Sequence, residues 1–91
     1  YWTMKGYHVP RRFGWDCHGL PVEHEINKTH GLQTRKQILE MGIREYNQAC
    51  RSIVNRYTRE WKKTIRRIGR WVDMEQPYST MDQDFMQSVW W

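Results

Sequence analysis

A helical period runs through the segment from Ile43 to Trp71 and constrains the fold more than any other feature of the sequence. At 100° per residue, ten mostly apolar side chains of this segment and of Val72, the residue after it, fall within an arc of about 120°. They are Cys50, Ile53, Val54, Tyr57, Trp61, Thr64, Ile65, Ile68, Trp71 and Val72. The pattern predicts one long amphipathic helix whose apolar side packs into a core, with a binding groove as the alternative.

The opposite side of this helix is basic. Between Arg51 and Arg70 the sequence has eight Lys and Arg residues and a single acid, Glu60. The whole chain of 91 residues has a formal charge of +5. A basic stripe of this kind is compatible with nucleic-acid phosphates as a partner. A face that only contacts water is the alternative, since charge runs on helices commonly face solvent.

The N-terminal part of the chain carries signals for a helix end and a strand. Tyr1–Tyr7 has the features of a helix end closed by Gly6, and Pro10 prevents a helix from continuing. The bulky Phe13 and Trp15 alternate with smaller or polar residues, which favours a short strand near residues 10–16.

Shorter helices are predicted before and after the long one. Pro21 suits the first turn of a helix that ends near Gly31, and the segment 34–37 fits a capping box of a short helix that ends at Gly42. Residues 76–79 form a predicted turn. Thr80 with Gln83 then predicts a second capping box, with Asp82 and Asp84 in the first turn of a last helix.

Composition narrows the class of protein. Only two cysteines are present, Cys17 and Cys50, which favours a reducing, intracellular compartment over a disulfide scaffold. No apolar run approaches the roughly 18 residues that a membrane span needs, and no signal peptide is recognisable. Because the sequence starts without Met and stops within an apolar stretch, we expect a piece of a longer polypeptide.

The stretch GWDCHGLP, residues 14–21, lies at the predicted junction of strand and helix. Ligands of open α/β sheets bind beyond the carboxyl ends of strands, where Asp16 lies. Its carboxylate could accept a charge-assisted hydrogen bond from a ligand ammonium group, or it could cap its own turn. Gly14 and Gly19 flank this acid and, without a Cβ, would allow a ligand to come close.

Two other chemistries are less compatible with these residues. Cys17 and His18 are neighbours on an extended segment and so point to opposite faces, which disfavours a thiol–imidazole pair. A loop histidine that reaches a phosphate is the minority alternative for His18. No cysteine or histidine pair has the spacing of a zinc site, since His24 and His30 are one residue too far apart. We therefore expect no metal site.

The segments GYHVPRRFGWDCHGLPVE, residues 6–23, and residues 50–91 resemble isoleucyl-tRNA synthetases of the eukaryotic cytosolic type. The resemblance covers nearly the whole chain. Leucine enzymes typically have Ala-Phe at the positions of Cys17 and His18, and valine enzymes have a Thr-Asp-His-Ala pattern there. A relative of the leucine or valine type, and a basic helical module that binds RNA, are the alternative interpretations.

The resemblance implies an α/β fold: part of a Rossmann-like catalytic domain of a class I aminoacyl-tRNA synthetase, mostly helical within these residues, with one short strand near residues 10–16. Residues 1–91 would lie in the N-terminal half of that domain, after the HIGH motif and before the editing insertion. In the family, the acid at the position of Asp16 holds the α-ammonium group of the amino acid. Gly14, Trp15 and His18 would then shape the pocket and its loop.

The same resemblance implies the substrates. They are isoleucine, ATP with Mg²⁺ and tRNA(Ile), and the intact cytoplasmic enzyme would form isoleucyl-adenylate and transfer the isoleucine to the tRNA. The remainder of the same polypeptide would be the main partner of these residues. This segment alone would bind no cofactor and catalyse no reaction.

Overall fold

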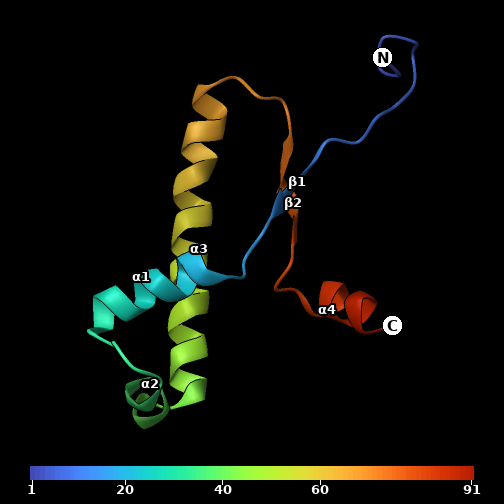
Figure 1. Cartoon of the computed structure of the whole chain (residues 1–91). Coiled ribbons are helices and arrows are strands. Elements are labelled where there is room, and N and C mark those ends of the chain that lie inside the picture. Colours follow the sequence, from blue (N-terminus) through green and yellow to red (C-terminus); the bar gives the residue numbers. More distant parts are fainter.

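The computed structural model describes residues 1–91, which form four helices and two strands (Figure 1). In chain order they are β1 (Arg12–Trp15), α1 (Leu20–His30), α2 (Arg35–Met41), α3 (Ile43–Arg67), β2 (Asp73–Ser79) and α4 (Gln83–Trp90). The long helix α3 is the axis of the molecule, and α1 and α2 pack against it. The strands pair with each other beside α3, and α4 follows β2 at the C-terminal end.

The predicted junction of strand and helix is confirmed. β1 covers the middle of the predicted strand, and α1 begins at Leu20 with Pro21 in its first turn. The helix ends at Gly31, as its sequence signals predict. The capping box that starts α2 is also confirmed, because the Thr34 side chain accepts from the Gln37 amide while the Gln37 side chain accepts from the Thr34 amide.

The expectation that residues 10–16 form the only strand is wrong. Residues 76–79, predicted as a turn, belong to β2, which pairs with β1 in parallel. The register is irregular: Arg12 lies opposite Asp73, but Gly14 lies opposite Tyr78. Three residues of β1 therefore face six of β2, and the extra residues of β2 form a bulge.

Contacts within this bulge explain how a segment with proline joins a sheet. Proline has no amide hydrogen for a strand ladder, which is why Pro77 predicts a turn. The Arg12 guanidinium donates instead to the carbonyl oxygens of Gln76 (2.6 Å) and Pro77 (3.4 Å). Asp73 accepts from the amides of Glu75 and Gln76, so a local turn does exist inside the strand.

The long helix ends four residues earlier than its apolar period predicts. α3 stops at Arg67, and Trp71 lies outside it. Gly69 takes a left-handed conformation with φ of 73°, and the Arg70 amide donates to the Ile65 carbonyl at 3.3 Å. This is the hydrogen bond of a Schellman motif, and it closes the helix.

Both chain ends differ from the prediction. Residues 2–6 form a turn rather than the end of a helix, since they make only a single turn of hydrogen bonds around Trp2 and Lys5. The capping box of Thr80 and Gln83 is wrong: Asp82 is the N-cap of α4. The Thr80 hydroxyl accepts instead from the Cys17 amide at 2.8 Å and so ties β2 to the end of β1.

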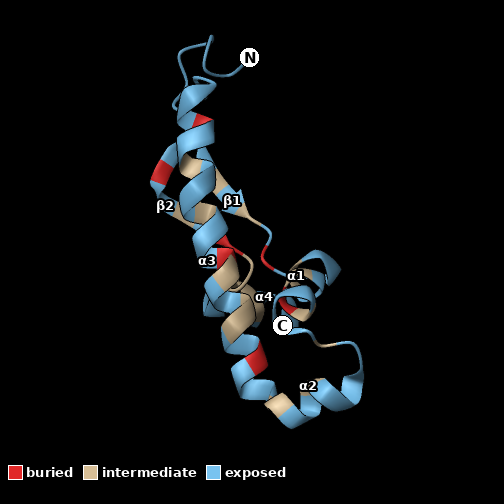
Figure 2. Ribbon diagram, turned by 90° about the vertical axis from the view of Figure 1, so that its left-hand side faces the viewer, coloured by how far each residue is buried: buried red, intermediate tan, exposed pale blue.

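Only seven residues are buried, and Figure 2 shows them dispersed along the ribbon. Ile26 of α1 and Val54 of α3 belong to this small core, and the Tyr46 hydroxyl links the two helices by donating to Asn27 at 3.0 Å. Of the ten residues in the predicted apolar arc, only Val54 and Ile65 are buried. The remaining apolar side of α3 is therefore partly or fully exposed within these residues.

Candidate functional site

Asp16 directly follows β1, at the carboxyl end of the strand and before the first turn of α1. Its side chain is exposed, accepts no hydrogen bond and forms no ion pair. The turn-capping alternative therefore has no hydrogen bond to support it. An exposed carboxylate without a protein partner is available to a ligand.

A cavity of about 310 Å³ opens beside Asp16. Its lining residues come from the end of β1, from α1 and from α3, and Figure 1 shows that these two helices cross. Three segments line it: Trp15, the last residue of β1, and Asp16 after it; Pro21, Val22 and Glu25 of α1; and Ile53, Val54, Tyr57, Thr58 and Trp61 of α3. The wall that α3 contributes is mostly apolar or aromatic, so part of the apolar arc of this helix forms one side of a cavity.

The chemistry of this lining suits a cation with an apolar body. Apolar walls favour a hydrocarbon group, and a carboxylate at the rim favours an ammonium group. Glu25 provides a second carboxylate on the lining and was not among the predicted site residues. The sequence does hold a signal for it, because Val22, Glu25 and Ile26 have the spacing of one helix face.

The structure separates the four predicted site residues. Trp15 and Asp16 line the cavity. The Trp15 ring packs on the Phe13 ring, with 4.5 Å between the ring centres. Gly14 does not line it. A Cβ on Gly14 would lie 3.0 Å from Cδ1 of Tyr78, so the absent side chain makes room for the neighbouring strand.

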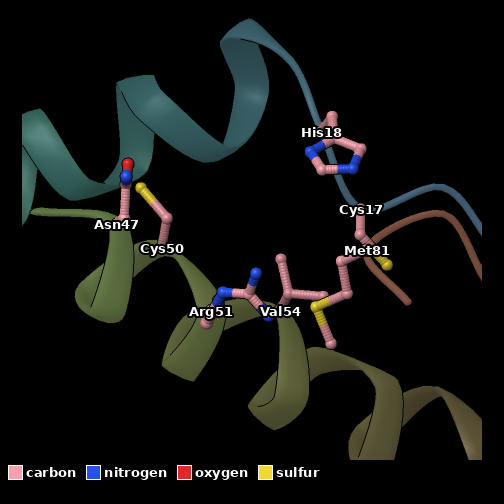
Figure 3. A pocket seen from close by; sticks show the side chains of 7 residues that line it. All are labelled: Cys17, His18, Asn47, Cys50, Arg51, Val54 and Met81. Carbon is pink, nitrogen blue, oxygen red and sulfur yellow. The ribbon is translucent and has the colours of Figure 1, made fainter. Parts of the chain in front are cut away.

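His18 lines a second cavity of about 290 Å³, shown in Figure 3. The other lining residues are Cys17, Asn47, Cys50, Arg51, Val54 and Met81. Nε2 of His18 lies 2.9 Å from the carbonyl oxygen of Thr80, which anchors the ring at the edge of this cavity. Val54 lines both cavities, so they are neighbours along α3.

Cys17 and His18 do not act on each other. The buried Cys17 thiol lies 3.2 Å from the Ser79 hydroxyl, whereas the imidazole contacts Thr80, and Figure 3 shows the two side chains pointing to different sides. This confirms that sequence neighbours on an extended segment diverge. The second cysteine, Cys50, is also free, and burial together with the Glu23 carboxylate raises its thiol pKa.

Two further observations concern metals and membranes. No group of three or more His, Cys, Asp and Glu side chains gathers in a way that could hold a metal ion. None of the helices combines the length and the apolar character that crossing a membrane requires.

Comparison with known proteins assigns the family. The family model described as tRNA synthetases class I (I, L, M and V) matches residues 1–91. Isoleucine–tRNA ligase of Bdellovibrio bacteriovorus is 74% identical over all 91 residues, which is 9% of that protein. The cytoplasmic isoleucine–tRNA ligases of Arabidopsis thaliana and Mus musculus are 58% and 56% identical over the same span, 8% and 7% of their lengths.

The chain thus spans about a tenth of the length of the curated relatives that it matches. The resemblance stated from its motifs is confirmed, since these relatives carry the name of the isoleucine enzyme and include cytoplasmic eukaryotic forms. The α/β class is confirmed in its coarse form, as helices with a small parallel sheet. The chain belongs to the family of class I tRNA synthetases for isoleucine, leucine, methionine and valine.

Proposed function

We propose that these residues form the amino-acid site of an isoleucine–tRNA ligase, in which the Asp16 carboxylate binds the α-ammonium group of isoleucine. The observation that carries this proposal is a carboxylate without a protein partner at the rim of a cavity with apolar walls. The ammonium group would contact Asp16, and the hydrocarbon side chain would face apolar residues. Glu25, on the same lining, adds negative potential for the same cation.

Trp15, Gly14 and His18 would support the site in different ways. The Trp15 ring forms part of the wall. Gly14 lets Tyr78 approach β1 and so fixes the strand that precedes Asp16. His18 holds the loop after Asp16 through its contact with the Thr80 carbonyl. Gly14 and His18 thus act on the position of the carboxylate, and Trp15 acts on the shape of the cavity.

The wider reaction belongs to the whole protein. Residues 1–91 would be part of a Rossmann-like catalytic domain, between the HIGH motif and the editing insertion. Isoleucine would react with ATP, which enters with Mg²⁺ as a substrate, and the isoleucyl group would pass to tRNA(Ile) in the cytoplasm. An ammonium contact is common to all amino acids, so the choice of isoleucine depends on apolar walls. A missing methylene is worth only about 1–3 kcal/mol, a magnitude for which the isoleucine enzyme is itself a standard example.

Isoleucine-dependent exchange between ATP and pyrophosphate tests the proposal in the intact enzyme. A hydrogen bond to a charged group is worth about 1.5–3 kcal/mol, so Asp16→Ala should raise the KM for isoleucine about 10- to 100-fold. Asp16→Asn keeps the shape and should lose most of the same affinity. The KM for ATP should change little in either variant.

Asp84→Ala is the matched control, because Asp84 is an exposed acid in the first turn of α4, away from the cavity. It should leave both KM values unchanged. Near-normal isoleucine affinity in Asp16→Ala would rule the assignment out. Exchange driven better by leucine or valine than by isoleucine would point instead to a relative of another specificity.

A further inference from the structure

The basic residues of α3 share one side of the helix. Its solvent side carries Arg51, Arg56, Arg59, Lys62, Lys63, Arg66 and Arg67, with Arg70 just beyond the helix. We call these eight residues the basic face. At 100° per residue they lie opposite the apolar arc, whose side of the helix packs against α1. The elements that cover α3 therefore leave its basic face open except at the half-buried Lys62.

Three members of the basic face already have partners. Arg56 pairs with Glu60 at 3.1 Å, Arg66 lies 3.9 Å from Glu75, and the Arg70 guanidinium lies 5.5 Å from the centre of the Phe13 ring. Both ion pairs are largely exposed to water, so they stabilise the fold little.

The other five cations have no acidic partner. They are Arg51, Arg59, Lys62, Lys63 and Arg67. Like charges on one helix face repel one another, and a polyanion would relieve that repulsion. From Arg51 to Arg67 the helix rises about 24 Å at 1.5 Å per residue. The phosphates of one duplex strand are spaced about 3.4 Å apart when measured along the duplex axis, so a duplex lying along the helix would place about seven of them within this length.

One end of the basic face lies at the site. Arg51 lines the second cavity together with His18 and Asn47 (Figure 3). That cavity shares Val54 with the cavity beside Asp16. A strand that follows the five cations without an acidic partner toward Arg51 therefore arrives next to the proposed position of the amino acid.

We infer that the basic face of α3 binds the sugar-phosphate backbone of an RNA strand and leads its end to the cavity lined by His18 and Arg51. The identity of this RNA as the tRNA substrate rests on the proposed function. An acidic protein segment is the competing partner. RNA fits better because its charges repeat regularly over the length of the helix, whereas those of an acidic segment need not.

The test compares two triple variants of the intact enzyme with the same loss of charge. Arg59→Gln/Lys63→Gln/Arg67→Gln removes three of the five cations of the basic face that have no acidic partner. The control Lys28→Gln/Arg35→Gln/Lys36→Gln removes three from α1 and α2. Affinity for a transcript of tRNA(Ile) is measured between 50 and 200 mM salt without isoleucine or ATP, and isoleucine-dependent exchange is measured without RNA.

Each lost phosphate contact should reduce the slope of log affinity against log salt by about one. The first triple variant should therefore lower the slope by about three and the affinity at least about tenfold at physiological salt. Its exchange activity should stay within about twofold of the parent, and the control should match the parent in both assays. Isoleucine-dependent exchange needs no RNA. An error in the proposed amino-acid site would therefore appear in the exchange assay, and an error in the proposed RNA surface would appear in the RNA affinity.

Three results would overturn the inference. The first is an unchanged slope and affinity in the basic-face variant, and the second is an equal loss in both triple variants. The third is competition by poly-glutamate as strong as that by the transcript, which would identify an acidic polypeptide as the partner. If the triple variant also loses exchange activity, the single variant Lys63→Gln tests the inference. Its slope of log affinity against log salt must fall by about one, while Lys63→Arg must keep the slope of the parent enzyme.

Discussion

At the scale of single residues, Asp16 and Gly14 lie two positions apart and depend on different neighbours. Asp16 lines a cavity and has no partner in the chain, whereas a side chain at Gly14 would meet the Tyr78 ring. The motif GWDCHGLP therefore combines a candidate ligand group with a packing requirement. Asp16 at the end of the strand could be predicted from the sequence. The reason for Gly14 could not, since Tyr78 is distant in sequence.

Gly14→Ala should destabilise the fold by about 1 kcal/mol, because the new Cβ would lie 3.0 Å from Cδ1 of Tyr78 and would force this half-exposed ring to shift. The temperature at which the intact enzyme loses exchange activity measures this loss and should fall by about 2 °C or more. Tyr78→Ala in the same chain removes the crowded ring. The double variant should therefore lose less stability than the sum of the losses in the two single variants. Strictly additive effects would contradict the packing role of Gly14.

At the scale of elements, helices could be predicted better than strands. The capping box at Thr34 and the period of α3 depend on residues close in sequence, and the structure has both helices. β2 could not be predicted, because it depends on Arg12, which lies 64 positions from Gln76, to satisfy the carbonyls of its bulge. Glu25 was missed for a related reason. The cavity that Glu25 lines exists only because α3, which is distant in sequence, forms its other side.

The end of α3 gives a prediction at this scale. Gly69→Ala should cost about 1 kcal/mol, because alanine disfavours the left-handed conformation that the helix end requires. Hydrogen exchange of the Arg70 amide, which donates to Ile65, should become about fivefold faster in the intact enzyme. Gly69→Asn is the control and should have a smaller effect, since asparagine tolerates this conformation. Equal rates in Gly69→Ala and the parent would show that the motif does not hold the helix end.

At the scale of the whole molecule, these 91 residues are extended. The radius of gyration is 17.2 Å, whereas a compact domain of this length has about 12 Å. Large apolar side chains are exposed, among them Trp71 at 87% and Trp90 at 90%. In the proposed ligase, further residues of the polypeptide would cover these surfaces.

The chain on its own should therefore lack a cooperative unfolding transition. Seven buried residues provide too little apolar burial to offset the entropy of ordering 91 residues. Circular dichroism should show helix that melts gradually, and tryptophan fluorescence should show no coincident step. A sharp, concentration-independent transition seen by both probes would mean that these residues form an independent domain.

The most direct test of the central claim compares isoleucine with its desamino analogue as ligands of the intact enzyme. If Asp16 binds the ammonium group, the parent enzyme should bind isoleucine at least about tenfold more tightly than the desamino analogue. Asp16→Asn should lose most of this preference while its affinity for the analogue stays that of the parent. If Asp16→Asn kept the full preference for isoleucine, another group would hold the ammonium, and the account of this site would be wrong.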